Sequence, residues 1–175
     1  YKAFNLKIEK GKYIFDVKKP NDVVQDIELR LQGKHNVMNA LAALAMADVY
    51  GVSLENIKKQ LATFKGVKRR FSYKIKTNDF VLIDDYAHHP TELNAVENSI
   101  REMYPNEKVL AVFQPHLFSR TKDFIDDFAK ALSKFDEVIL LDIYPAREEP
   151  IPNVTSEWLL SKINIKQKKI TEKKN

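Results

Sequence analysis

The 175-residue sequence contains no cysteine, which excludes disulfide bonds and thiolate metal sites. Glycine is scarce, with 4 residues in the whole chain. Two of them precede a lysine, at Gly11 and Gly33, but the residues that follow are Tyr13 and His35 rather than the serine or threonine of a phosphate-binding loop. No apolar run approaches the ~20 residues that span a bilayer, and the N-terminus does not have the pattern of a signal peptide. We therefore expect a soluble, cytoplasmic protein without a membrane partner.

The charge of the chain is unevenly distributed. The formal net charge is +5, and much of this excess lies in the last residues, 166–175, with the sequence KQKKITEKKN. Such a tail can contact nucleic acid or acidic lipid, or it can be a solvated, frayed end. No aromatic residues are interleaved with the lysines as base stacking would require. We therefore favour the solvated tail and expect no nucleic-acid partner.

The first third of the chain changes from strand patterns to helix patterns. Residues 3–17 alternate apolar and polar on both sides of Lys10-Gly11, which predicts a β-hairpin. Residues 26–31 also alternate and predict a further strand. The alanine-rich segment 35–51 has helical spacing and stops at Gly51. A second helix is predicted from Ser53, whose hydroxyl suits an N-cap.

The remainder of the chain has the pattern of an α/β domain. Three short apolar runs, at residues 80–84, 108–114 and 137–144, are typical of strands buried on both faces. Helical patterns alternate with them, at residues 90–104, 121–135 and 156–163. This order predicts a Rossmann-like, three-layer domain with a mainly parallel sheet. We place a boundary near residues 65–68, which separates residues 1–66 from residues 67–175.

Each apolar run leads directly into a polar loop: DDYAHHP, QPHLFSRT and DIYPAREEP. Ligands of open parallel sheets bind outside the carboxyl ends of the strands. We therefore expect the titratable residues of these loops to lie along one binding edge. They are Asp85, His88, His89, His116, Arg120, Asp142 and Arg147.

Individual residues of the DDYAHHP loop have structural alternatives. Only one of Asp84 and Asp85 can face a cleft if the strand continues, and the other then caps or solvates the turn. His88 and His89 are adjacent and point in opposite directions, so they are poor joint ligands of one ion, and we expect no bound metal. His89 precedes Pro90 and suits a helix start, so His88 is the better functional candidate.

Arg120 and a polar cluster near residue 35 raise similar alternatives. An arginine at a helix start is disfavoured by the helix dipole, so Arg120 is better explained by an anionic ligand held bidentately. His35, Asn36 and Asn39 lie at a helix start, where Asn36 is a plausible cap. Asn39 is already inside the helix, where asparagine costs stability. Because an asparagine amide matches the donor and acceptor edge of adenine, a nucleotide contact is the rival interpretation.

Five motifs occur in an order and at a spacing that resemble the Mur ligases. They are GKHNVMNALAA, GVKRRF, DDYAHHPTE, QPHLFSRT and LDIYPAREEPI, and together they cover roughly residues 30–152. The stretch QPHLFSRT favours the members that attach L-alanine to UDP-N-acetylmuramate over those that attach a recycled tripeptide. The resemblance implies an ATP- and Mg²⁺-dependent ligase of peptidoglycan synthesis that forms an amide through an acyl phosphate.

The resemblance also implies roles for particular residues. The nucleotide would be bound by His35, Asn36, Asn39, Arg69, Arg70 and Asp85. The reacting carboxylate and the incoming amino acid would be met by Tyr86, His88, His116 and Arg120, with His88, His116 and Arg120 as the catalytic residues. Charge on an acyl phosphate and on a tetrahedral intermediate suits such preorganised donors.

The chain departs from the family pattern in two ways. Leu117 occupies a position that is often a second arginine, and the chain has no GKT phosphate loop. We therefore expect a fragment that is inactive alone: residues 1–66 would end the central ATP-binding domain, and residues 67–175 would form a C-terminal domain, possibly truncated. The missing N-terminal and central domains would be its partners. The alternatives are a stand-alone Rossmann-type nucleotide-binding or regulatory module and, less favoured, a basic nucleic-acid-binding domain.

Overall fold

The computed structural model describes residues 1–31 and 33–172. The chain divides into two compact units, residues 1–86 and residues 87–175, and each is considered separately. The last three lysine-tail residues, 173–175, lie outside the described residues. Within the described part, no helix has the length and hydropathy needed to cross a membrane.

The first unit opens with an antiparallel sheet in the order β1-β2-β3. The strands are β1 (Lys2–Glu9), β2 (Lys12–Lys18) and β3 (Val23–Leu29). The predicted hairpin is confirmed, because Glu9 pairs with Lys12 across the turn. Lys10 and Gly11 both have positive φ, at 50° and 74°, as a two-residue type I′ turn requires. The third strand begins and ends earlier than residues 26–31.

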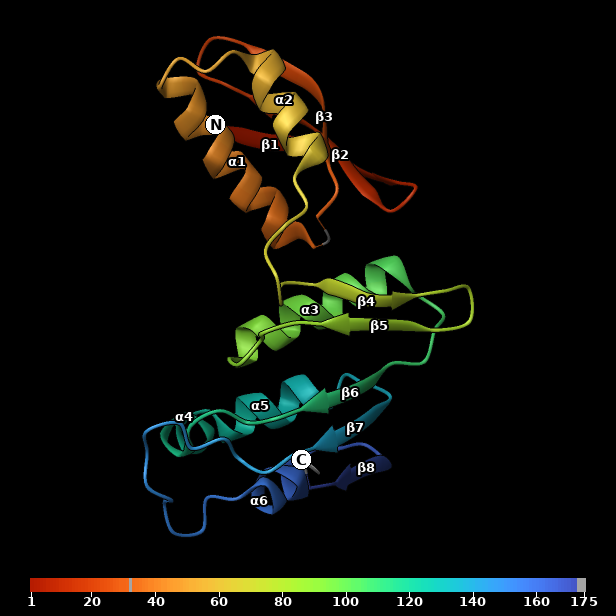
Figure 1. Ribbon diagram of the computed structural model, residues 1–175, viewed down its shortest axis with the longest axis vertical. Coiled ribbons are helices and arrows are strands. Elements are labelled where there is room, and N and C mark those ends of the chain that lie inside the picture. The colour runs from red at the N-terminus through yellow and green to blue at the C-terminus, as the bar shows by residue number, and fades with distance from the viewer. Residues whose placement is uncertain (32, 173–175) are drawn as a thin grey trace. The chain divides into compact units, whose positions relative to one another are not determined.

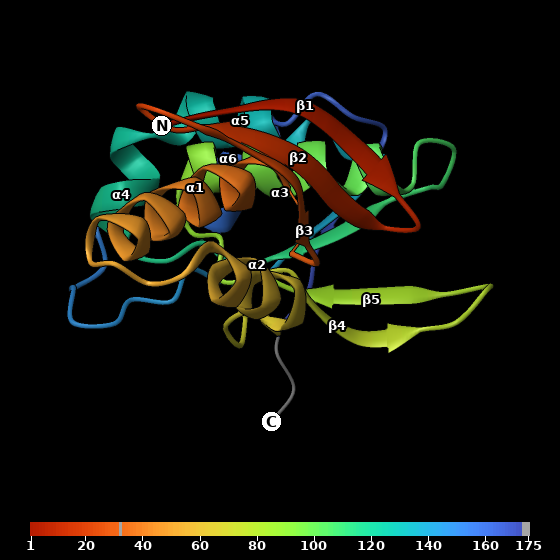
Figure 2. The same cartoon turned by 90° about the horizontal axis from the view of Figure 1, so that it is seen from above.

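Two helices cover one side of this sheet: α1 (Lys34–Val49) and α2 (Leu54–Thr63) (Figure 2). Alternate residues of β2, Tyr13, Phe15 and Val17, are fully buried beneath them. The predicted cap of α2 is confirmed, because the Ser53 hydroxyl accepts a hydrogen bond from the Asn56 N–H at 3.4 Å. Both helices therefore lie where the sequence pattern places them.

The segment at residues 80–84 differs from the prediction. It forms β5 (Val81–Asp84), which pairs antiparallel with β4 (Ser72–Lys76) in a two-stranded sheet. Leu82 is 44% exposed, so β5 is not buried on both faces. A short apolar run does not reveal its pairing partner, and β4 carries too many polar residues to be recognised by periodicity.

The second unit contains a parallel sheet in the order β6-β7-β8, whose arrows point the same way in Figure 1. The strands are β6 (Leu110–Phe113), β7 (Glu137–Leu140) and β8 (Gln167–Ile170). The α/β class with a parallel sheet is thus confirmed. The interpretation of the lysine-rich segment as a frayed end is wrong for β8, whose Lys168 ammonium donates to the carbonyl oxygens of Leu160, at 3.0 Å, and Ile163.

Four helices accompany this sheet: α3 (Pro90–Met103), α4 (Phe118–Asp123), α5 (Ile125–Leu132) and α6 (Ser156–Lys162). The single helix predicted at residues 121–135 is interrupted at Phe124, where φ is −115°. The core of the unit is built from apolar residues of the helices and strands, among them Leu93, Phe113, Phe128, Leu132, Val138, Leu140 and Leu159. This core fixes the positions of the loops that follow β6 and β7.

Candidate active site

The loops after β6 and β7 are joined to each other by main-chain hydrogen bonds. The Tyr144 N–H donates to the Pro115 carbonyl at 2.8 Å, and the Leu117 N–H donates to the Tyr144 carbonyl at 2.9 Å. His116 and Tyr144 form an isolated parallel bridge between these loops. The shared carboxyl end of two parallel strands thus continues as a rigid platform that carries His116.

Three of the predicted residues meet on this platform. The rings of His88 and His116 lie with their centroids 6.1 Å apart, and the Tyr144 ring lies 5.4 Å from His116 on another side. The Arg120 guanidinium, from the first turns of α4, approaches His116 with an Nη1–Nδ1 separation of 3.5 Å. All three candidates are half-buried. The structure therefore brings together His88, His116 and Arg120 within the second unit.

The two adjacent histidines have different surroundings. The His88 N–H donates to the Glu92 carboxylate at 2.9 Å, and His88 Nδ1 lies 3.3 Å from the same oxygen. His89 is the N-cap of α3, where its Nδ1 accepts from the Thr91 N–H at 3.3 Å, and its ring packs on Phe124. As the sequence alternative proposes, His89 has a structural place at the helix start, whereas His88 faces His116.

The electrostatics of the platform favour a neutral His116. Partial burial lowers the pKa of this imidazole, the nearby Arg120 and His88 lower it further, and Glu148 opposes the shift. The pKa of Glu148 is itself lowered, because its carboxylate accepts hydrogen bonds from the hydroxyl and the N–H of Ser119. A neutral imidazole beside a guanidinium can accept a proton, while the guanidinium provides a fixed positive charge.

Two other residues predicted at this edge, Asp142 and Arg147, lie outside the cluster of His88, His116 and Arg120. Asp142 uses its main-chain carbonyl to accept from the Gln114 side chain at 3.0 Å, and Arg147 is exposed. The residues that the sequence analysis missed are Glu92 and Glu148. The available signal was a glutamate three residues after the predicted cap His89, because a carboxylate at that position reaches back to the backbone before the helix. Across the described ranges, no group of three or more metal-ligating side chains is found.

In the first unit, the loop before β4 is fastened to the end of β5. The Asp85 carboxylate accepts from the Phe71 N–H at 2.7 Å, and the Tyr86 N–H donates to the Arg69 carbonyl at 2.8 Å. The Arg69 guanidinium lies 4.6 Å from the centre of the Tyr86 ring. Asp84 instead approaches the Lys74 ammonium at 3.4 Å. Of the two aspartates, Asp85 therefore has the clearer structural role.

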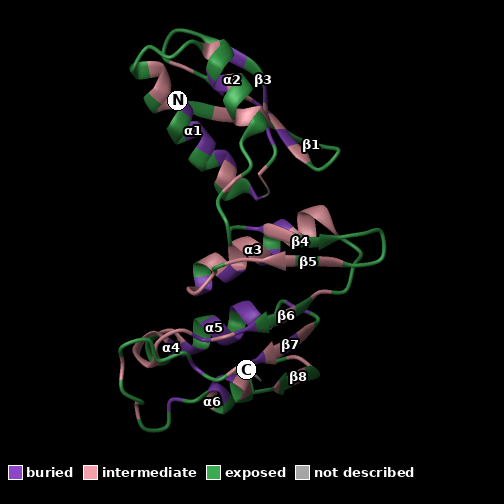
Figure 3. Ribbon diagram, in the orientation of Figure 1, coloured by how far each residue is buried: buried purple, intermediate pink, exposed green. Residues whose placement is uncertain are grey.

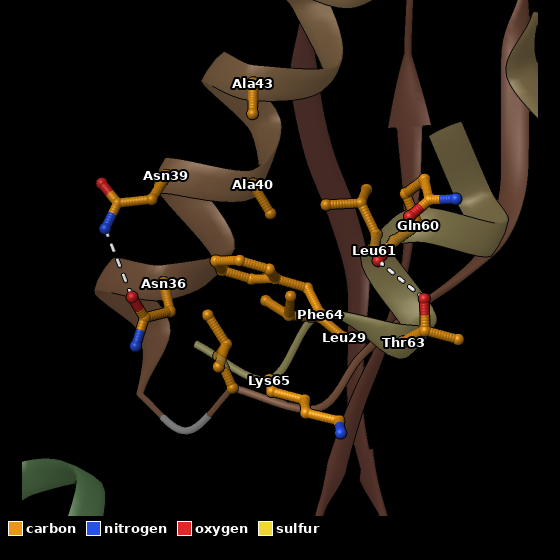
Figure 4. Close-up of a pocket in the computed structure, with 11 residues that line it drawn as sticks. Leu29, Asn36, Asn39, Ala40, Ala43, Gln60, Leu61, Thr63, Phe64 and Lys65 are labelled. Carbon is orange, nitrogen blue, oxygen red and sulfur yellow. Dashed lines mark hydrogen bonds between the residues drawn. The ribbon is translucent and has the colours of Figure 1, made fainter. Parts of the chain in front are cut away.

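A pocket opens between α1 and α2 in the same unit (Figure 4). Its volume is about 580 Å³, which is within the usual range for small-molecule sites. The Phe64 ring extends toward Ala40, and the amides of Asn36 and Asn39 lie beside one another at the margin, joined by a hydrogen bond of 3.3 Å. The full lining is Leu29, Leu31, Asn36, Asn39, Ala40, Ala43, Gln60, Leu61, Thr63, Phe64 and Lys65.

His35 lies next to this asparagine pair in sequence. Much of its side chain is exposed, yet partial desolvation of the ring lowers its pKa, an effect that Asp85 opposes and Arg70 reinforces. His35, Arg70 and Asp85 thus influence one another electrostatically within the first unit. The first unit thus carries a largely apolar pocket between α1 and α2 and a group of charged residues near the end of β5.

Comparison with known proteins places this geometry in a family. The chain is 64% identical over 171 residues to the UDP-N-acetylmuramate–L-alanine ligase of Flavobacterium psychrophilum, covering 98% of this chain and 38% of that protein. It is 59% identical over 175 residues to the protein of the same name from Christiangramia forsetii, covering 39% of it. The chain thus spans about two fifths of the length of these relatives.

Comparison with solved structures and with family models leads to the same family. The crystal structure of the UDP-N-acetylmuramate–alanine ligase of Thermotoga maritima matches with a TM-score of 0.78 and 29% identity, over 98% of this chain and 37% of that one. The family described as Mur ligase, glutamate ligase domain, matches residues 69–174. The chain therefore belongs to the Mur ligase family.

Proposed function

We propose that the protein of which this chain forms part joins L-alanine to UDP-N-acetylmuramate, with ATP, through an acyl phosphate intermediate in peptidoglycan synthesis. The observation that carries this proposal is the 64% identity with a ligase of that name, which extends over 98% of the chain. We assign residues 1–66 to the end of the central ATP-binding domain and residues 67–175 to the C-terminal domain. The enzyme would act in the cytoplasm on small molecules.

The cluster in the second unit suits the amide-forming step. Arg120 would bind a carboxylate or stabilise the charge of a tetrahedral intermediate through paired N–H donors. His116, whose pKa is lowered by burial and by Arg120, would remain neutral near pH 7 and accept a proton from the incoming amine. His88, positioned by Glu92, would share this role or orient the substrate. In the first unit, we propose Tyr86 as a substrate contact.

The first unit suits the nucleotide. Asn36 and Asn39 would bind the adenine edge beside Phe64, and His35, Arg69, Arg70 and Asp85 would lie toward the ribose and phosphates. ATP supplies the phosphoryl group that activates the carboxylate, with Mg²⁺ as its counterion. Because the chain spans 38% of the length of its relative, we propose that Mg²⁺ and the phosphates are held mainly by parts of the protein outside this chain.

The surface of α1 supports the view that more polypeptide covers this unit. Met38, Met46 and Val49 lie along one stripe of the helix and are 61%, 65% and 75% exposed. Figure 3 shows exposed and buried residues alternating along α1. Large apolar side chains on one exposed stripe often mark a surface that other polypeptide covers. Because the chain spans 38% of the length of its relative, we propose that it is inactive by itself.

The direct test measures phosphate release from ATP and Mg²⁺ with UDP-N-acetylmuramate and L-alanine. The full-length protein should release phosphate only when both substrates are present, and the 175-residue chain should release none. Turnover by the chain alone would refute its assignment as an inactive part. Activity of the full-length protein with a tripeptide, but not with L-alanine, would refute the proposed substrate.

The nucleotide site is tested separately by substitution. Asn39→Ala should raise the KM for ATP by about 10-fold, since a bidentate amide–adenine contact is worth roughly 1–3 kcal/mol. Asn56→Ala, on the exposed side of α2, is the matched control and should leave the KM unchanged. Equal effects of both changes would argue against an adenine contact at Asn39.

A second candidate function, a stand-alone nucleotide-binding module, is favoured by one observation. The pocket between α1 and α2 has a volume of about 580 Å³, which is large enough for a small-molecule ligand. Such a module would bind ATP measurably without further domains. Calorimetry of the 175-residue chain decides this point: no heat of binding at millimolar ATP would eliminate the module.

A further inference from the structure

We propose that Glu148 is a positioning residue for the His116–Arg120 pair, holding both groups in place from the loop that follows β7. The proposal rests on the function proposed above, because that function gives the pair its role. Glu148 acts through the backbone that carries Arg120.

Glu148 replaces a missing helix cap. Leu117, at the N-cap position of α4, has no side-chain group that can bind the first turn. The Glu148 carboxylate supplies this cap from 29 residues away, accepting from the Ser119 N–H at 2.9 Å and from the Ser119 hydroxyl. Arg120 is the next residue along the chain, so the bond at Ser119 fixes the backbone from which the guanidinium extends.

The backbone at Leu117 is strained, so contacts from other parts of the chain are needed to hold it. Leu117 has φ of 76° and ψ of 133°, a region that disfavours residues with a side chain. Such a conformation costs on the order of 1–3 kcal/mol and persists only where surrounding contacts determine it. The contacts here are the two main-chain bonds that Tyr144 makes, one with Leu117 and one with Pro115, and the bond of the Glu148 carboxylate to Ser119. Removing the carboxylate would free the backbone segment between Leu117 and Arg120.

The charge of Glu148 also acts on the pair. His116 is surrounded by Arg120 and His88, which disfavour its protonated form, and by Glu148, which favours it. The Tyr144 ring lies 5.4 Å from the His116 ring and is 51% exposed. Glu148 is therefore the anionic group that balances the guanidinium in this part of the site.

The first experiment uses the 175-residue chain and nuclear magnetic resonance titration of its 4 histidines. Glu148→Gln keeps the size of the side chain and removes its charge, and it should move the His116 titration to lower pH. Glu149→Gln is the matched control, because Glu149 is adjacent and exposed, and it should leave the titration unchanged. Glu148→Ala removes both bonds to Ser119 and should perturb the Arg120 resonances more than Ser119→Ala, which removes one of them.

The second experiment measures the pH profile of the full-length protein. Glu148→Ala removes both acceptors of the Ser119 bonds; it should lower kcat/KM for L-alanine about 10- to 100-fold, as misplacement of a positioned group does, and should shift the acidic limb of the profile. An unchanged profile would refute the positioning role. If the full-length wild type lacks ligase activity, the proposed function fails, whereas an unmoved His116 titration in the shorter chain refutes the role of Glu148 itself.

Discussion

The adjacent carboxylates Asp84 and Asp85 should contribute very differently to stability. Asp85→Ala removes the acceptor of the Phe71 N–H, a bond of 2.7 Å to a residue that is 7% exposed. Leaving a buried donor without its charged acceptor costs roughly 1.5–3 kcal/mol. Asp84→Ala should cost about 0–1 kcal/mol, because its partner Lys74 is half exposed and lies 3.4 Å away.

Hydrogen exchange of the Phe71 amide provides the sharpest assay. A loss of about 2 kcal/mol corresponds to exchange about 30-fold faster, provided that the amide opens with the first unit. Urea unfolding followed by circular dichroism should show the same order, with a lower midpoint for Asp85→Ala than for Asp84→Ala. Because the two aspartates are neighbours of identical chemistry, general effects of charge removal cancel in the comparison.

Two results would refute this reasoning. One is an unchanged exchange rate for Phe71 in Asp85→Ala, and the other is a larger loss of stability in Asp84→Ala. Asp85→Asn separates the structural role from the proposed nucleotide role, since its amide oxygen can still accept the Phe71 N–H. We expect this variant to recover most of the stability but to bind ATP more weakly in the full-length protein.

Three further predictions concern pH, backbone conformation and packing. The folded-state pKa values of His35 and His116 are lowered, so the unfolded chain binds more protons below about pH 6.5. The urea midpoint should therefore fall as the pH drops through this range. Replacing both histidines with glutamine should make the midpoint less dependent on pH. An increase in stability toward low pH would contradict this prediction. Gly66→Ala should destabilise the first unit by at least about 1 kcal/mol, because φ is +81° and a Cβ would meet the Leu31 Cδ2 at 2.7 Å, and a neutral urea midpoint would refute the strain. Phe128 is 0% exposed, so Phe128→Ala should lower the free energy of unfolding by about 3–5 kcal/mol, measured by the fluorescence of the single tryptophan. A decrease under about 1 kcal/mol would show that the core collapses around the cavity.

The parts of the fold that were predicted from sequence are those with local causes. The Lys10-Gly11 turn adopts two positive φ angles, and the hairpin register follows from that turn. Ser53 caps α2, and Pro90 begins α3 behind the His89 cap. In each case the residues that carry the signal lie within a few positions of the structure that they determine. Such features can therefore be predicted from a single sequence.

The parts that were not predicted depend on distant partners. The apolar run at residues 80–84 is a strand, but its antiparallel pairing with β4 cannot be read from its own composition. The strand at residues 167–170 is hidden by lysines, yet Lys168 satisfies two carbonyl oxygens near the end of α6. A long lysine side chain can bury its aliphatic part and direct its ammonium to the backbone. From composition alone, such a lysine is indistinguishable from one that is exposed to solvent.

The candidate site shows the same division at the level of single residues. The loops that carry His116 and Tyr144 lie near one another because the parallel strands β6 and β7 deliver their carboxyl ends to one edge. The position of His88 does not follow from this rule, because His88 comes after β5, which belongs to a separate two-stranded sheet. The orientation of the cluster depends on Glu92, on Glu148 and on the left-handed backbone of Leu117. A left-handed leucine is not foreseeable from sequence, because its cost is accepted only when bonds from another loop enforce it. Topology therefore determines which chemical groups can cooperate, and contacts between loops determine whether they do.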